Sequence, residues 1–230
     1  MLKAVAGTAV TLAVLGVGGY FADSAVRATA EDRVATALQQ ELDLSARPLV
    51  HLGGVPFSLA LVTRSVPDAS AEAAVVPLAM SGQQVELTDV RLTTGAIQLE
   101  DGQARIASAR ATAVLGYADL ARVAGVPVAP AGNGRLELRY ARDVLGRELT
   151  LAISVRPELD VEAALVRLTD PRLEVGGQSV DVNLSQAQLD AIVEPISVEL
   201  EQGLRLTSID PTGAGVGVAV AGEDLAVPLG

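Results

Sequence analysis

The first periodic pattern in the chain repeats every four residues. Val26, Ala30, Val34, Leu38 and Leu42 share this spacing within residues 23–42, and the charged residues there lie off this stripe. A repeat of this kind places apolar side chains on one face of an α-helix. The pattern predicts a helix over residues 23–42 that packs its apolar face against a core. A helix lying on a membrane surface is the alternative.

Residues 49–182 show mainly the two-residue alternation of β-strands. Apolar and polar residues alternate over residues 135–140 and again over residues 148–156. The connection between them, residues 141–147, carries the turn-forming types Asp and Gly. This arrangement predicts an antiparallel hairpin.

Two places interrupt the alternation. Between residues 83 and 94, the apolar positions are odd-numbered at first and even-numbered afterwards. A slip of one residue would turn half of the strand to the wrong face, so a β-bulge near Thr88 and Asp89 is the simplest explanation. A similar slip occurs at Leu165 and Val166.

Two further helices are predicted. The first is short and covers residues 116–125. The second covers residues 185–204, where Ser185 and Gln188 form a capping box and an apolar stripe follows. Pro195 falls inside this stripe and should kink or restart the helix.

The remaining signals complete the fold class. A second hairpin is predicted around Gly176 and Gly177, and the last strands are predicted over residues 204–209, 215–220 and 225–229. Strands and helices do not alternate regularly, which favours an α+β fold with a mostly antiparallel sheet. Long strands with bulges are typical of curved sheets.

The N-terminus carries an uncharged run over residues 4–22, preceded by Lys3. At 1.5 Å per residue this run is just long enough to cross a hydrocarbon core of about 30 Å. The positive charge before it keeps the N-terminus in the cytoplasm. Residues 1–22 are therefore predicted to be a signal-anchor or a cleaved signal peptide, and both alternatives export a single domain over residues 23–230.

Composition narrows the function classes. The net charge of −11 argues against a nucleic-acid binder, which needs a basic face. The absence of cysteine removes disulfides and thiolate metal sites. His51 is the only imidazole, and no nucleophile signature accompanies it. We expect no catalytic residues, no metal site and no cofactor; a hydrolase or transferase acting on envelope lipids is the alternative.

The expected core is almost entirely aliphatic. Beyond residue 22 the chain has only three aromatic residues, Phe57, Tyr117 and Tyr140, although half of all its residues are hydrophobic. An interior of Leu, Val, Ile and Ala can accommodate flexible acyl chains without imposing a fixed shape. A compositional bias of the genome would produce the same residue usage.

Three short motifs point to a family. The segment Gly54-Val55-Pro56-Phe57, the segment Asp89-Val90-Arg91-Leu92 and residues 113–120 together resemble the LmeA-type family of actinobacterial phospholipid-binding envelope proteins. The resemblance implies a fold like that of the tubular lipid-binding (TULIP) proteins. In such a fold, a long, curved and bulged antiparallel sheet wraps around two amphipathic helices, here after an N-terminal membrane-spanning segment.

The resemblance also implies a function. It predicts an exported protein, held at the periplasmic side of the cytoplasmic membrane, that binds phospholipid acyl chains in an apolar groove. Such a protein would support lipid handling or the biogenesis of cell-envelope lipoglycan and mannan. Phospholipid and the cytoplasmic membrane are its predicted partners. The alternative is a structural or protein-interaction domain of the envelope with a solid core and no ligand.

The predicted groove residues come from three segments: the stretch after the first motif, the short helix and the last helix. They are Phe57, Leu59, Leu61, Tyr117, Leu120, Leu189, Ile192, Val193 and Ile196.

Overall fold

A computed structural model describes residues 23–54, 57–80, 82–100, 102–144, 147–161, 165–175, 178–180, 196–197, 200 and 203–228. The segment predicted to be an anchor or signal peptide, residues 1–22, lies outside this part of the chain. Among the described residues, no helix is both long and apolar enough to cross a membrane.

The first sheet has eight strands and contains the first and the last strands of the described chain. Its main path is β1 (Leu49–Leu52), β3 (Ala69–Met80), β4 (Gln83–Thr94), β6 (Gln103–Gly116), β14 (Gly215–Pro228) and β13 (Leu204–Pro211). The short strands β2 (Ser65–Val66) and β5 (Ile97–Glu100) pair with each other, and β5 also pairs with β6.

The second sheet has six strands. Its path is β11 (Gln178–Val180), β10 (Leu165–Val175), β9 (Arg147–Asp160), β8 (Arg135–Val144) and β7 (Val128–Gly132), with β12 (Ile196–Ser197) beside β10. The pairings β8–β9 and β10–β11 confirm both predicted hairpins, although β8 and β9 extend further toward their turn than the alternation indicated.

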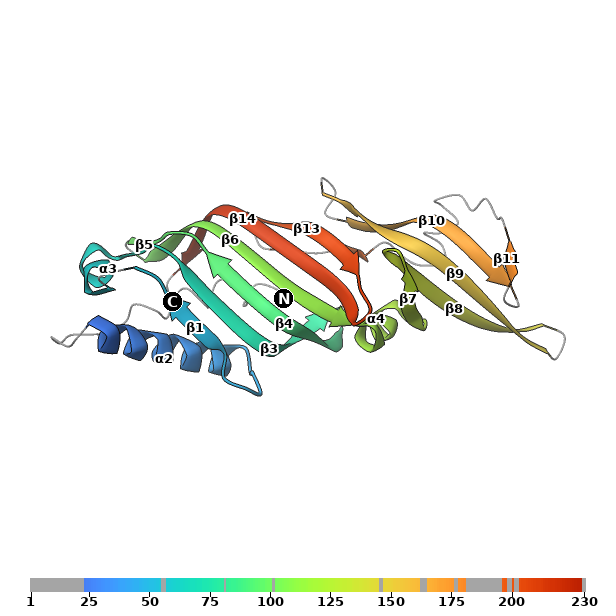
Figure 1. Ribbon diagram of the computed structural model, residues 1–230, viewed down its shortest axis with the longest axis horizontal. Coiled ribbons are helices and arrows are strands. Elements are labelled where there is room, and N and C mark those ends of the chain that lie inside the picture. The colour runs from blue at the N-terminus through green and yellow to red at the C-terminus, as the bar shows by residue number, and fades with distance from the viewer. Residues whose placement is uncertain are drawn as a thin grey trace.

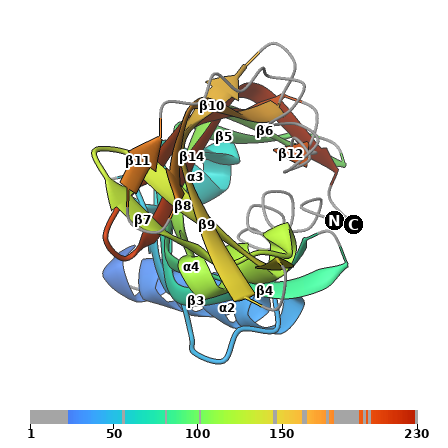
Figure 2. The same cartoon turned by 90° about the vertical axis from the view of Figure 1, so that its right-hand side faces the viewer.

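The two sheets lie end to end along the long axis of the molecule (Figure 1). Viewed along that axis, both sheets curve around it (Figure 2). Both sheets are antiparallel, which confirms the expected α+β class with curved antiparallel structure. The expectation of one long sheet was wrong, because α4 (Tyr117–Ala124) and the chain turn after it separate β6 from the second sheet.

Helix α2 (Asp23–Glu41) confirms the first predicted helix. Four residues of its predicted stripe are buried, and the fifth, Leu42, lies just after the helix and is half-buried. It lies along the side of the first sheet that carries β1 (Figure 1). Two of its carboxylates hold it there: Oδ2 of Asp23 accepts the backbone N–H of Phe57 at 2.8 Å, and Oε1 of Glu31 accepts that of Leu52 at 2.9 Å.

Helix α4 confirms the short predicted helix and ends at Gly125, whose φ of 69° is the left-handed geometry that glycine adopts without strain. Helix α3 (Phe57–Thr63) was not predicted. Its sequence, FSLALVT, is a short apolar run without a clear period, and such a run fits a strand or a helix equally well.

The bulge predicted near Thr88 and Asp89 is confirmed. The register of β4 against β6 shifts between Thr88 and Arg91, and Asp89 has a φ of 50°. The prediction of a similar slip at Leu165 and Val166 was wrong, because both residues pair regularly with β9. The bulge of β10 lies instead between Thr169 and Arg172, about Asp170.

Two predictions near the C-terminus need correction. The helix expected over residues 185–204 does not run to its predicted end: Ile196 and Ser197 form β12, and β13 begins at Leu204. Residues 185–195 lie outside the described residues. The strands expected over 215–220 and 225–229 are one strand, β14, because it keeps pairing with β6 on both sides of Asp224.

Candidate functional site

The most extensive apolar cluster among the described residues joins the two sheets. We call its buried members the junction core. They come from β3, β4, β6 and β14 of the first sheet, from α4, and from β8 and β9 of the second sheet. They are Leu78, Val85, Leu115, Leu120, Leu136, Leu138, Ile153, Val155 and Val216.

The pairing between β8 and β9 explains why this core is aliphatic. Leu136 and Leu138 of β8 stand opposite Val155 and Ile153 of β9, so four aliphatic side chains share one face of the second sheet. Residues between them, such as Glu137, point to the other face. The junction core is therefore the common apolar face of both sheets.

Half-buried apolar residues surround the junction core, and we call them the apolar rim. They are Met80, Leu87, Tyr117, Val123, Val126, Val128, Tyr140, Leu168, Leu173, Ile209 and Val218. All but the two tyrosines are aliphatic. Each CH₂ of an acyl chain that leaves water for such a surface gains about 0.8 kcal/mol. The rim offers this contact without the fixed ring geometry that aromatic side chains impose.

The two tyrosines place neutral polar atoms at the edge of this surface. The hydroxyl of Tyr117 donates a hydrogen bond to the backbone carbonyl of Thr212. Burial raises the pKa of both Tyr117 and Tyr140 above its ordinary value of 10.0. Both phenols are therefore neutral at physiological pH, and the rim gains no negative charge from them.

The structure brings two of the predicted groove residues together. Leu120 belongs to the junction core and Tyr117 to its rim. Phe57 lies elsewhere, only 1% exposed in a cluster that also contains Val26 and Leu52. The guanidinium of Arg27 lies over its ring, 5.7 Å from the centroid. Phe57 therefore packs α3 against α2 and the first sheet.

The other predicted groove residues are less defined. Leu59 and Leu61 belong to α3, and Ile196 pairs with Val166 as part of β12. Leu189, Ile192 and Val193 lie outside the described residues. The role of the whole predicted set in a groove stays a prediction.

The cavities between α2 and the first sheet are too small for a lipid. Two apolar cavities next to Leu38 have volumes of about 30 and 40 Å³. At about 10 to 15 Å³ per water on this measure, each would hold two to four waters and no acyl chain. Any acyl site must therefore lie away from these two cavities.

A larger hollow of about 440 Å³ lies on the face of the first sheet that points away from α2. Its polar lining residues are Asp89, Arg91, Thr112, Ser208 and Asp210. The sequence analysis identified Asp89 as part of a bulge and both Asp89 and Arg91 as part of a family motif, but it did not identify Thr112, Ser208 and Asp210. Five charged or hydroxyl side chains make this hollow more polar than the apolar rim, although Val218 belongs to both.

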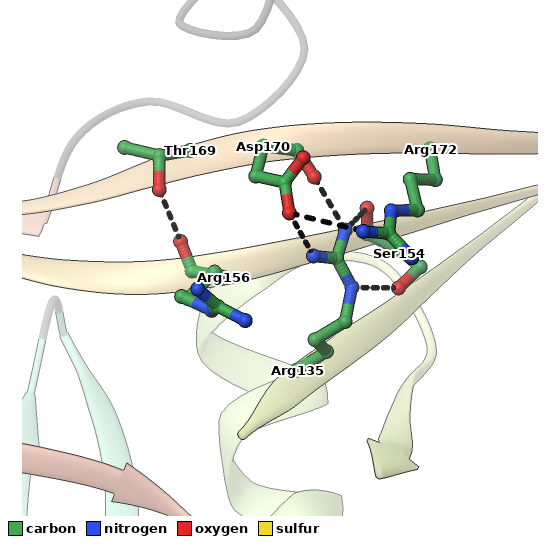
Figure 3. Close-up of polar contacts among 6 residues, drawn as sticks. All are labelled: Arg135, Ser154, Arg156, Thr169, Asp170 and Arg172. Atoms are coloured by element: carbon green, nitrogen blue, oxygen red, sulfur yellow. Dashed lines mark hydrogen bonds and ion pairs between the residues drawn. The ribbon is translucent and has the colours of Figure 1, made fainter. Parts of the chain in front are cut away.

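The second sheet has a polar cluster around the buried Arg135 (Figure 3). Arg135 and Ser154 alternate with the core residues Leu136 and Val155, so the cluster lies on the face opposite the junction core. Arg135 of β8, 5% exposed, donates to Oγ and to the carbonyl of Ser154, both at 2.8 Å. It also donates to the carboxylate and the carbonyl of Asp170 on β10. The hydrogen bond from Arg135 lowers the pKa of Asp170 below its ordinary 3.8.

The groups that could suggest catalysis are not assembled in the described part of the chain. Nδ1 of His51 lies 3.1 Å from Oε1 of Glu31, and the His51 side chain is 63% exposed. No group of three His, Cys, Asp or Glu residues within the described ranges could hold a metal ion.

Comparison with known proteins gives one match. The model of a family described as LmeA-like phospholipid-binding matches residues 21–221, which is most of the chain and ends within β14. Comparisons with curated proteins and with solved structures gave no match.

Proposed function

Because this chain belongs to the LmeA-like phospholipid-binding family, we propose that it binds the acyl chains of a phospholipid on the apolar rim of the junction core. The observation that carries this proposal is the rim itself: half-buried, nearly all aliphatic, and contributed by both sheets and α4. This site differs from the sequence-based groove, with which it shares Tyr117 and the neighbouring core residue Leu120.

The energetics favour exchange of lipid with a bilayer. An acyl chain moved from water to the rim gains about 0.8 kcal/mol per CH₂, but a chain that comes from a bilayer is already out of water. The net gain on transfer from a membrane is therefore close to zero. A protein of this kind holds lipid in proportion to its access to the membrane, so it must work beside one.

We propose that residues 1–22 provide this access by tethering the domain to the periplasmic side of the cytoplasmic membrane. The uncharged run after Lys3 supports the tether. The net charge of −11 would repel an anionic surface, so attraction by charge cannot replace it. In this position the protein would serve lipid handling or lipoglycan and mannan biogenesis, by binding rather than by catalysis.

Native mass spectrometry of the full-length protein, extracted in mild detergent from the cells that produced it, tests lipid binding. We expect a species whose mass exceeds that of the chain by one or more phospholipids. A homogeneous lipid-free mass would contradict the proposal and favour the alternative of a structural domain with a solid core.

Two matched variants locate the lipid. Leu173→Glu places a charge on the half-buried rim and should remove the lipid-bound species. Val161→Glu changes a residue that is 54% exposed and outside the rim, and it should leave lipid binding unchanged. Equal lipid content in the two variants would rule out the rim as the site.

A further inference from the structure

The two sheets contain the same bulge. Residues 87–92 read Leu-Thr-Asp-Val-Arg-Leu and residues 168–173 read Leu-Thr-Asp-Pro-Arg-Leu. In β4 the register shift lies between Thr88 and Arg91, and in β10 it lies between the corresponding Thr169 and Arg172.

The geometry of the two bulges agrees residue by residue. The φ of Asp89 is 50° and that of Asp170 is 48°. In each bulge the threonine hydroxyl donates to a carbonyl of the neighbouring strand at 3.3 Å, from Thr88 to Val114 and from Thr169 to Arg156.

The pairing continues identically into the next strands. Arg91 stands opposite Thr112, and Arg172 stands opposite Ser154, so each bulge faces a hydroxyl residue.

In the second sheet this bulge binds a guanidinium. Arg135 enters from β8, crosses β9 and donates to Asp170 and Ser154, as the converging side chains in Figure 3 show. The acceptors are a carboxylate, a hydroxyl and two carbonyls. Such a set matches the planar fork of donors on an arginine.

In the first sheet the same position is a glycine. In the first sheet, Val114 pairs with Thr88 on one side and with Gly217 on the other. In the second sheet, the corresponding Arg156 pairs with Thr169 on one side and, by continuation of the register, with Arg135 on the other. Gly217 has no side chain to cross β6. The hollow of about 440 Å³ lies over these residues, with Asp89 and Thr112 in its lining.

We propose that this hollow is a binding site for a guanidinium group, supplied by an arginine side chain of another polypeptide. The carboxylate of Asp89 and the hydroxyl of Thr112 correspond to the groups of Asp170 and Ser154 that hold Arg135. Ser208 and Asp210 of β13 add further acceptors to the lining.

The charges around the hollow are compatible with such a ligand. Within the described ranges, neither Asp89 nor Asp210 forms an ion pair, so both carboxylates are available. The neighbouring positive charge of Arg91 does not prevent binding. In the second sheet, Nη2 of the corresponding Arg172 lies 3.6 Å from Oδ2 of Asp170, and Asp170 still binds Arg135. Among the arginines whose side chains the structure describes, only Arg91 lines the hollow, so we assign the ligand to another molecule.

The proposed guanidinium site lies mainly on the face of the first sheet opposite the junction core, and Val218 is the residue of its lining that also belongs to the apolar rim. Leu115 and Val216 turn to the junction core, whereas their neighbours Val114 and Gly217 turn to the opposite face and line the hollow. Loss of guanidinium binding and loss of lipid binding can therefore be measured separately on the same protein.

The test is a titration of the ¹⁵N-labelled full-length protein with N-acetyl-arginine methylamide, followed by NMR. We expect saturable shifts of the backbone amides of Asp89, Thr112 and Gly217. N-acetyl-citrulline methylamide, which has the same shape without the charge, should produce no such shifts. The lysine analogue should bind more weakly, because an ammonium is a point donor rather than a fork.

Two variants sharpen the test. Asp89→Asn keeps a residue that tolerates positive φ and removes the charge, so it should weaken binding of the probe about tenfold or more. Gly217→Arg should fill the hollow from within, abolish the response to the probe and raise the melting temperature by about 2 to 4 °C. A Cβ at Gly217 would meet only the carbonyl oxygen of Asp210, at 3.4 Å, and Gly217→Ala is the control that leaves the hollow open.

Three results would overturn the proposal: no saturable shift at the three amides, equal binding of the citrulline probe, or unchanged binding in Asp89→Asn. If Gly217→Arg fails to fold, the Asp89→Asn comparison still decides.

Discussion

Arg135 of β8 donates hydrogen bonds to both the carboxylate and the backbone carbonyl of Asp170 on β10, across the intervening strand β9. The arginine is 5% exposed, whereas the side chain of its partner is 48% exposed. We call these hydrogen bonds of Arg135 the guanidinium clasp. The clasp links β8, β9 and β10 and stabilises the left-handed conformation of Asp170 in the bulge.

Removal of the arginine should destabilise the protein. Arg135→Ala leaves the half-buried acceptors of Ser154 without this donor, which costs about 1 to 3 kcal/mol. Urea unfolding at neutral pH measures this loss. Arg139→Ala, which changes an exposed arginine of the same strand, is the control and should have little effect. Equal unfolding midpoints for the two variants would contradict a structural role of the clasp.

The clasp also predicts a dependence of stability on pH. The hydrogen bond from Arg135 lowers the pKa of Asp170 below the ordinary 3.8. A carboxyl whose pKa is lower when folded contributes stability that is present above the unfolded pKa and is lost as the pH falls through the folded pKa. Asp170→Asn should therefore lower the urea midpoint at pH 7 and have a smaller effect at pH 2 to 3. The same deficit at both pH values would show that charge is not involved.

The other bulge makes a prediction about backbone conformation. Asp89 has a φ of 50°, where aspartate and asparagine are tolerated and β-branched residues are strained. Asp89→Val should cost about 1 to 3 kcal/mol in unfolding free energy, whereas Asp89→Asn should be nearly neutral. Denaturant unfolding of the two variants distinguishes them, and equal stability would mean that the bulge is not held in this conformation.

The sequence allowed part of this architecture to be predicted. The four-residue stripe of α2 and the alternation in β8 and β9 are local signals, because each depends only on which face of one element is buried. The bulge at Asp89 was also visible, since the apolar phase had to shift for Val85 and Val90 to stay on one face.

Other features depend on contacts between distant residues and could not be read locally. The bulge of β10 lies at Asp170, because its register is set by pairing with β9. The polar run around Glu223 resembles a turn, yet β14 continues through it because β6 supplies a partner on both sides. The guanidinium clasp had one sequence signal, the repeated Leu-Thr-Asp-x-Arg-Leu, which acquires meaning only when the two bulges are compared in space.

Phe57 provides a prediction that separates stability from lipid binding. It is 1% exposed and packs against α2 rather than in the junction core, so Phe57→Ala should destabilise the protein by about 3 to 5 kcal/mol. The lipid content of the fraction that remains folded should not change. Chemical unfolding and native mass spectrometry measure the two effects, and lost lipid with unchanged stability would place Phe57 in the binding site instead.

The most direct test of the proposed function is cross-linking of the full-length protein in membranes that contain a phospholipid with a photoreactive group on its acyl chain. Mass spectrometry of the labelled peptides then locates the lipid. The rim predicts labels on peptides that contain Tyr140, Leu168 and Leu173 of the second sheet, with the label lost in Leu173→Glu and kept in Val161→Glu. Labels confined to residues 1–22, or none beyond background, would contradict lipid binding at the junction of the two sheets.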